Sequence, residues 1–170
     1  MARRIFYSFH YEQDAWRAAQ VRNMGIVEGN KPAQDNEWEE ITRGGEQAIK
    51  RWIESQMEGR TCVVVLIGEK TWERKWVQYE IKRGWERGMG LLGVYIHTLK
   101  DRDGKPARRG KNPFAFADLF LGETSLERIV KAYDPQIEIN SLDSQLWYQY
   151  IKKHLSEWIE EAIEIRQKYR

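Results

Sequence analysis

Glu80 stands in a setting that favours chemistry at its carboxylate. On the helix expected around it, Trp76 lies one turn earlier, and Val77, Ile81 and Gly84 form the buried stripe beside it. A carboxylate held between an indole and a packed sheet loses part of its hydration, which tends to raise its pKa. Carboxyl groups perturbed in this way are common in active sites, so Glu80 is the first candidate for a catalytic residue.

A simpler interpretation of Glu80 competes with the catalytic one. Arg83 and Lys75 are cationic neighbours on the same helix, and Glu80 could reach water at the edge of the core and pair with one of them. Helix geometry alone favours this simpler arrangement. The catalytic interpretation therefore depends on what else surrounds Glu80.

The elements that position these residues follow from the spacing of the apolar side chains. Strands are expected at residues 5–9, 26–27, 61–67, 91–97 and 137–139. Helices are expected at residues 12–23, 45–57, 71–87 and about 144–169, with a further short helix within 119–133. Loops are expected at residues 28–40 and about 100–115. Strands and helices therefore alternate along the chain.

This alternation predicts an α/β fold built from right-handed βαβ units. We expect a flavodoxin-like, five-stranded parallel sheet in the order 2-1-3-4-5, with helices on both faces. Strands 1 and 3 are then neighbours, and a ligand binds in the crevice outside their carboxyl ends. Strand 1 ends in residues 8–11 and the helix of Glu80 follows strand 3, so both segments are expected at this crevice.

Length and composition fit one globular domain that covers residues 1–170. The net charge is +2. The composition, with 41% hydrophobic and 32% charged residues, argues against disorder. The single Cys62 and three scattered His exclude a Cys/His zinc site, so no metal is expected. No apolar run approaches the roughly 20 residues of a membrane span, and no signal peptide precedes the first strand. We therefore expect a cytoplasmic protein without membrane contact.

Charge and aromatic residues are unevenly distributed along the chain. Residues 100–111 contain six basic and two acidic side chains, hence +4, but no interleaved aromatic residues, so a nucleic-acid partner is not expected. The chain has eight Trp. Most of them, Trp16 included, are expected on helix faces that cover the sheet, whereas Trp38 and Trp76 fall near the crevice.

Two stretches of the sequence carry a resemblance to a known family. Residues 6–9, Phe-Tyr-Ser-Phe, resemble the first-strand signature of Toll/interleukin-1 receptor (TIR) domains. Residues 74–80, Arg-Lys-Trp-Val-Gln-Tyr-Glu, resemble the Ser-x-Trp-Cys-x-x-Glu helix motif of the same domains. Arg74 stands where the common pattern has Ser, and Val77 stands where it has Cys.

The nearer resemblance is to a prokaryotic branch of this family. Four segments are similar to the TIR-like family of the Thoeris antiphage defence system: residues 8–11, 66–68, 76–81 and 112–114. The resemblance covers residues 1 to about 115 in order and spacing. It implies the same five-stranded flavodoxin-like fold that the patterning predicts.

The resemblance also implies an enzyme that cleaves NAD⁺ at the nicotinamide glycosidic bond. Glu80 stands at the position of the family's catalytic glutamate, and NAD⁺ is a substrate rather than a cofactor. Loss of neutral nicotinamide needs no second acid and leaves an oxocarbenium-like ribose, which a carboxylate stabilises. Ring closure within the nucleotide gives a cyclic ADP-ribose, and water gives ADP-ribose. A separate effector that responds to this diffusible signal is the implied partner, and self-association into a homo-oligomer is a further option.

Four aromatic residues are candidates for binding the substrate. Phe9 and Tyr11 could stack on nicotinamide or adenine, although Phe9 fits the core equally well. Trp38 is expected in the loop after the second strand, where its ring could meet adenine or pack on the next helix. Trp76 is expected at the wall of the crevice, one turn before Glu80.

Two polar residues at the end of strand 1 complete the candidate site. His10 could bind a phosphate or a ribose hydroxyl, but a single His at a strand end is often only a satisfied polar residue. Ser8 could supply a hydroxyl to the ligand or merely cap the turn. For both residues, a purely structural role is therefore an alternative to ligand binding.

The sequence leaves three other functions open. A TIR-type interaction module would assemble without catalysis, and the aromatic face of the long C-terminal helix favours it. A phospho-receiver would need acidic residues after strand 1 and an Asp after strand 3, where this chain has residues 9–11, Phe-His-Tyr, and 66–68, Leu-Ile-Gly. A nucleoside 2-deoxyribosyltransferase would share the glutamate chemistry, and substrate profiling would separate it from an NAD⁺-cleaving enzyme.

Overall fold

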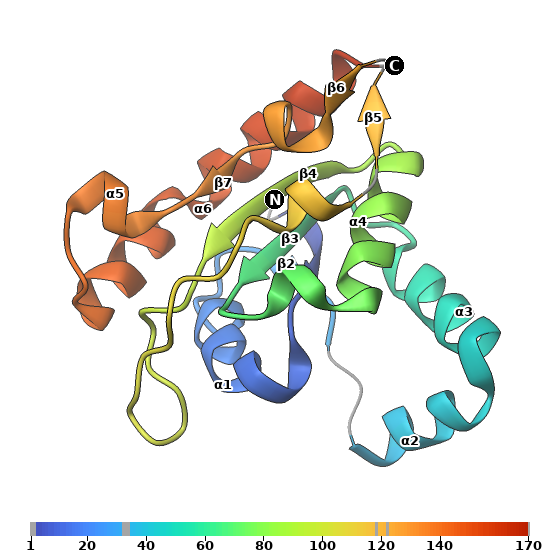
Figure 1. The fold of residues 1–170 in the computed structure, drawn as a ribbon, viewed down its shortest axis with the longest axis horizontal. Helices are drawn as coiled ribbons and strands as arrows, with labels where there is room; N and C mark the ends of the chain where they lie inside the picture. The colour runs from blue at the N-terminus through green and yellow to red at the C-terminus, as the bar shows by residue number, and fades with distance from the viewer. Residues whose placement is uncertain (1–2, 32–34, 118, 122, 170) are drawn as a thin grey trace.

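A parallel sheet forms the centre of the computed structural model, which describes residues 3–31, 35–117, 119–121 and 123–169 (Figure 1). Its five strands are β1 (Arg4–Ser8), β2 (Glu28–Gly29), β3 (Cys62–Ile67), β4 (Gly90–Tyr95) and β7 (Ala132–Tyr133). They pair in the order β2-β1-β3-β4-β7, and every pair is parallel. The predicted fold class and strand order are confirmed.

Helices pack on both faces of this sheet. The described residues form α1 (Tyr11–Arg22), α2 (Asp35–Arg43), α3 (Gly45–Met57), α4 (Lys75–Glu86), α5 (Pro135–Ile139) and α6 (Ser144–Gln167). Helix α6 packs on β4 and β3 and contacts α1, while α4 packs on the opposite face of the same strands and α3 contacts β1. None of these helices combines the length and apolarity of a membrane-spanning helix.

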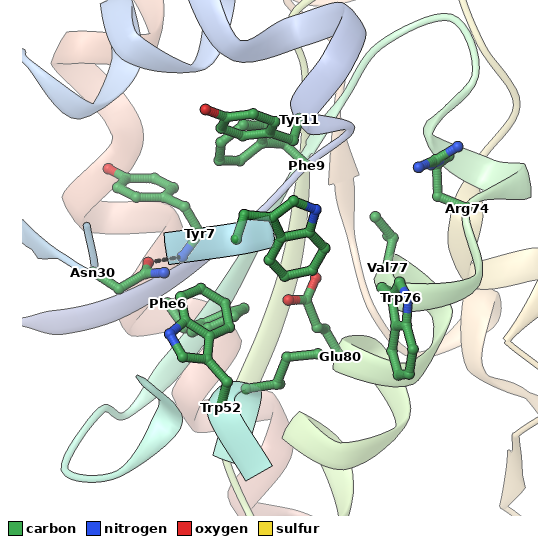
Figure 2. A pocket seen from close by; sticks show the side chains of 12 residues that line it. Phe6, Tyr7, Phe9, Tyr11, Asn30, Trp52, Arg74, Trp76, Val77 and Glu80 are labelled. Carbon is green, nitrogen blue, oxygen red and sulfur yellow. Dashed lines mark hydrogen bonds between the residues drawn. The ribbon is translucent and has the colours of Figure 1, made fainter. Parts of the chain in front are cut away.

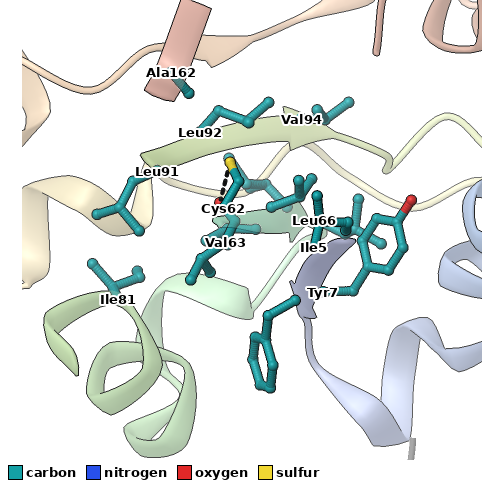
Figure 3. Packing of buried hydrophobic residues seen from close by; sticks show 14 of the residues in the cluster. Ile5, Tyr7, Cys62, Val63, Leu66, Ile81, Leu91, Leu92, Val94 and Ala162 are labelled. Atoms are coloured by element: carbon teal, nitrogen blue, oxygen red, sulfur yellow. Dashed lines mark hydrogen bonds between the residues drawn. The ribbon is translucent and has the colours of Figure 1, made fainter. Parts of the chain in front are cut away.

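The central strand β3 is buried along its whole length because its side chains are apolar on both faces. Figure 3 shows how the two layers meet there, with Ile81 of α4 near Val63 on one face and Ala162 of α6 near Leu92 on the other. A Cβ added at Gly84 would lie 2.6 Å from Val63 Cγ2. The missing side chain at this position lets α4, the helix that carries Glu80, lie close to the sheet.

Short elements connect the larger ones. The part of the chain that the structure describes also has three single-turn helices: η1 (Thr71–Glu73), η2 (Pro113–Phe116) and η3 (Leu126–Arg128). A small antiparallel pair, β5 (Phe120–Leu121) and β6 (Thr124–Ser125), precedes η3. The region 119–133 thus holds a short helix, as predicted, but also three short strands that the patterning did not indicate.

The prediction of a loop over residues 28–40 is wrong, because α2 begins within it. Trp38 and Ile41 lie one turn apart on α2, and both pack against the core, which gives this short helix a buried face. Trp38 therefore lies on a helix, not in a loop. The strand predicted at residues 26–27 is displaced by two residues, to Glu28–Gly29.

The last predicted strand, at residues 137–139, is also wrong, because α5 occupies this segment. Asp134 caps α5 by accepting a hydrogen bond from the Gln136 backbone N–H at 3.0 Å, and Pro135 follows at its first position. Asn140 ends the helix in the left-handed conformation with φ of 50°. These signals outweigh the apolar alternation, and the edge strand is β7 instead. Trp16, expected to cover the sheet, is 55% exposed.

Candidate active site

The sheet order brings together two polar side chains that lie far apart in the sequence. Strands β1 and β3 pair directly, with Ser8 opposite Val65, so the chain leaves both strands at the same edge of the sheet. Glu80 lies on α4, which follows β3. The Ser8 hydroxyl donates a hydrogen bond to Glu80 Oε1 at 2.7 Å. The carboxyl group is therefore held at the predicted crevice.

The simpler interpretation of Glu80, a surface ion pair, is wrong. Arg83 donates to Glu54 Oε1 at 2.6 Å, and Lys75 pairs with Glu46. The two cations are thus engaged with other carboxylates, and Glu80 turns towards the sheet instead. The predicted burial of Val77, Ile81 and Gly84 beside it is confirmed.

Burial dominates the acidity of Glu80. Loss of hydration raises its pKa from the ordinary 4.5 to about 8, and the hydrogen bond from Ser8 lowers it only in part. Near neutral pH the ligand-free site thus holds mostly a neutral carboxylic acid. A positive charge placed beside it would favour the ionised form.

A pocket opens in front of this carboxyl group, with a cavity volume of about 120 Å³. Five predicted site residues line it: Phe9, Tyr11, Trp38, Trp76 and Glu80. In Figure 2 the Glu80 carboxylate lies near the centre, between the rings of Phe9 and Tyr11 on one side and Trp52 on the other. The described walls are mainly aromatic, and Glu80 is the acidic side chain among the described lining residues, which suits a flat ligand with an electron-poor centre.

The aromatic rings that form the walls support one another. The rings of Phe9 and Tyr11 lie 6.4 Å apart at a tilt of 34°. Trp38 from α2 meets Trp52 from α3 edge to face at 5.9 Å. Helix α2, which sequence patterning missed, thus brings Trp38 to the pocket.

Two predicted substrate-binding residues, Ser8 and His10, do not line the pocket as the described residues define it. The Ser8 hydroxyl is hydrogen-bonded to Glu80, so Ser8 influences the site through the Glu80 carboxyl group. His10 is buried and caps α1, where its Nδ1 accepts from the Gln13 backbone N–H at 3.3 Å. Burial, and next the charge of Arg74, lower the pKa of His10 and favour its neutral form.

Sequence reasoning missed Asn30, Trp52 and Arg74, which also line the pocket. Asn30 is buried, and its Oδ1 accepts a hydrogen bond from the Tyr7 backbone N–H at 2.7 Å, which leaves the amide N–H₂ group as a donor. No sequence pattern marked Asn30. Trp52 has the helical spacing of a core residue, and Arg74 was noted only as a departure from the common TIR motif.

Among the described residues there is no group of three or more His, Cys, Asp or Glu side chains placed to hold a metal ion.

A doubly wound parallel sheet with a partly buried glutamate and aromatic walls at its switch point is the arrangement expected of a TIR-type α/β domain. Comparison with known families agrees: residues 6–101 match the model of the Thoeris protein ThsB, TIR-like domain. The chain belongs to this family.

A curated relative supports the same assignment. A protein of Bacillus cereus (strain MSX-D12), named "Putative cyclic ADP-D-ribose synthase ThsB1", is 35% identical to the chain over 121 residues. The alignment covers 68% of this chain and 63% of the relative. The chain therefore spans less than two thirds of that relative's length.

Proposed function

We propose that this protein cleaves NAD⁺ at the nicotinamide glycosidic bond and forms a cyclic or otherwise modified ADP-ribose. The observation that carries the proposal is the Glu80 carboxyl group, hydrogen-bonded by Ser8 and facing a pocket with aromatic walls. The name of the Bacillus cereus relative supports a cyclic ADP-ribose as product. In a Thoeris setting such a nucleotide would act as a diffusible signal to a separate antiphage effector.

The proposed reaction begins when the bond between ribose C1′ and the pyridinium nitrogen breaks. The bonding electrons go to nitrogen, so nicotinamide leaves as a neutral molecule and the positive charge moves to the ribose. The Glu80 carboxylate stabilises this oxocarbenium-like centre or holds the ribose hydroxyls. A nucleophile of the same nucleotide, or water, then attacks C1′ and releases a proton.

The aromatic residues have two roles in this proposal. The rings of Phe9, Tyr11, Trp38 and Trp76 offer faces on which nicotinamide and adenine stack. They also keep water away from C1′, and exclusion of water favours ring closure over hydrolysis. The ratio of cyclic to linear product should therefore depend on these rings.

The proposal is tested by incubating the wild type, Glu80→Gln and Glu86→Gln with NAD⁺ and measuring nicotinamide release. Glu86→Gln is the matched control, because Glu86 lies on the same helix but is exposed. We expect release by the wild type and the control, and a loss of at least 100-fold in Glu80→Gln, the size of a removed electrostatic contact to the transition state. Equal release by all three proteins would refute the role of Glu80, and mass spectrometry of the products would identify the ADP-ribose formed.

A second candidate function is assembly without catalysis. Ile137, Leu142 and Leu146 are 74%, 63% and 48% exposed around the junction of α5 and α6, and exposed apolar side chains favour protein contacts. Light scattering over a range of protein concentrations would reveal such self-association. Assembly of a wild-type protein that releases no nicotinamide from NAD⁺ would favour this function over the enzyme.

A further inference from the structure

The pocket contains one cationic side chain among its described residues, Arg74. Glu80 is the one carboxyl group among the described residues that line this pocket, and burial keeps it largely neutral near pH 7. Among the described lining residues, the guanidinium at the edge of the pocket is therefore the side chain that carries a full charge when no ligand is bound. A ligand that places an anion there gains from this charge.

The charge of Arg74 is available to a ligand because no described carboxylate neutralises it. No salt bridge or hydrogen bond of the Arg74 side chain is found within the described residues, and the side chain is exposed. By contrast, Arg83, Arg109 and Arg17 are paired with carboxylates at 2.6, 2.7 and 2.9 Å. Its neighbour Lys75 is likewise paired, with Glu46.

Arg74 faces the turn that follows β1. Figure 2 shows its guanidinium near the edge of the pocket, on the side opposite Asn30, with the Glu80 carboxylate between them. Its charge is also felt by His10, whose pKa it lowers, while Glu12 and Glu73 act on His10 in the opposite direction but do not line the pocket. An anion bound beside Arg74 would therefore lie near the start of α1 and α4.

Spacing along α4 relates this cation to the reacting centre. Glu80 follows Arg74 by six residues, which corresponds to about 9 Å along a helix axis. In a nicotinamide dinucleotide the diphosphate is separated from C1′ by the ribose ring and its 5′ carbon. A ribose placed at Glu80 can therefore extend its diphosphate towards a long side chain at the start of the same helix.

We propose that Arg74 binds the diphosphate of the dinucleotide and so makes the pocket selective for a dinucleotide over a nicotinamide nucleoside. This inference rests on the proposed function for the identity of the ligand. The planar guanidinium presents paired donors that match phosphate oxygens, a geometry that a lysine ammonium does not reproduce. Arg74 is a binding residue in this scheme and takes no part in breaking the glycosidic bond.

The test compares ligands that share the nicotinamide riboside group and differ in phosphate. Binding of NAD⁺ and of nicotinamide riboside is measured by calorimetry in the Glu80→Gln background, where cleavage is blocked. Arg74→Gln is expected to weaken NAD⁺ binding by about 10- to 100-fold and to leave nicotinamide riboside binding unchanged. Arg74→Lys should recover part of the loss, and the control Lys82→Gln, which removes an exposed cation of α4 outside the pocket, should cause none.

The outcomes separate this inference from the proposed function. Three results would overturn the role of Arg74: equally weakened binding of both ligands in Arg74→Gln, unchanged NAD⁺ binding in that variant, or no NAD⁺ binding at all. Binding of NAD⁺ that depends on Arg74, with no nicotinamide release by the wild-type protein, would support the inference and refute the enzyme. In the active protein Arg74→Gln is expected to raise KM for NAD⁺ and leave kcat unchanged, because the contact is made equally in ground and transition states.

Discussion

The Glu80 carboxyl group is expected to destabilise the fold at neutral pH, so the neutral substitution Glu80→Gln should raise the free energy of unfolding. Burial places the pKa of Glu80 at about 8 in the folded state, against an ordinary 4.5. A group whose pKa is raised on folding contributes its full stability below the unfolded value and loses it as pH rises through the folded value. Between pH 4.5 and 8 the unfolded chain ionises here while the folded chain keeps its proton.

The magnitude follows from this separation, since each pKa unit corresponds to about 1.36 kcal/mol. The decrease in the free energy of unfolding caused by Glu80 is less than about 1 kcal/mol at pH 5 and about 3 kcal/mol at pH 7, and it approaches about 5 kcal/mol above pH 8. Gln is uncharged in both states and keeps an oxygen that can accept the hydrogen bond from Ser8. The variant should therefore gain these amounts relative to the wild type.

Urea unfolding of the wild type, Glu80→Gln and Glu86→Gln at pH 5, 7 and 9 measures the effect. The exposed Glu86 pairs with Arg83 only at 3.9 Å, so its substitution should change stability by less than about 0.5 kcal/mol at each pH. The raised pKa of Glu80 would be refuted if the gain in free energy of unfolding of Glu80→Gln did not increase with pH. It would also be refuted if Glu80→Gln were less stable than the wild type at pH 7. A variant that is both more stable and inactive would show that the loss of activity is chemical.

Two further predictions concern buried polar side chains, Ser8 and Arg17. Ser8→Ala removes the hydroxyl that lowers the pKa of Glu80, so the midpoint of the pH profile of kcat/KM for nicotinamide release should move upward from about pH 8. Ser8→Thr, which keeps a hydroxyl, should restore the wild-type midpoint. An unchanged midpoint in Ser8→Ala would contradict the role of this hydrogen bond. Arg17→Met leaves the buried Asp14, paired at 2.9 Å, without its cation and should cost about 3–5 kcal/mol in urea unfolding. The exposed Arg43→Met should cost less than about 0.5 kcal/mol, and an equally small loss for Arg17→Met would show that the buried pair contributes little.

The parts of the fold that the sequence predicted are those with long, uniform patterns. The apolar run of β3 and the apolar series of α6 each persist over their whole element, so tertiary packing reinforces the local signal. The errors fall in short segments. At Pro135–Ile139 the alternation of Ile and Glu is typical of a strand, but the Asp134 cap and the proline select a helix. The helix α2 depends on the packing of Trp38, which spacing alone does not reveal.

The candidate site could be predicted where its residues lie on helices and strands with a clear sequence pattern. The crevice follows from the strand order, and the place of Glu80 beside the buried stripe follows from the spacing on α4. The choice of Glu80 as a catalytic candidate over a surface ion pair depended on the resemblance of residues 74–80 to the TIR helix motif. The hydrogen bond from Ser8 could not be predicted, because it depends on the register of β1 against β3 and on the orientation of one side chain. Asn30 was missed for the same reason, since its place at the pocket is fixed by its hydrogen bond to the Tyr7 backbone.

The environment that keeps Glu80 protonated in the free protein also explains how a substrate could activate it. The pyridinium ring of NAD⁺ carries a positive charge, and a cation close to a buried carboxyl group favours its ionised form. Binding of NAD⁺ would then release the proton of Glu80, whereas the uncharged ring of NADH would not. As the glycosidic bond breaks, the positive charge moves from the ring to C1′, so an attraction already formed in the complex strengthens in the transition state. In the proposed reaction the positive charge leaves C1′ when the nucleophile attacks, and Glu80 would regain a proton as the product leaves.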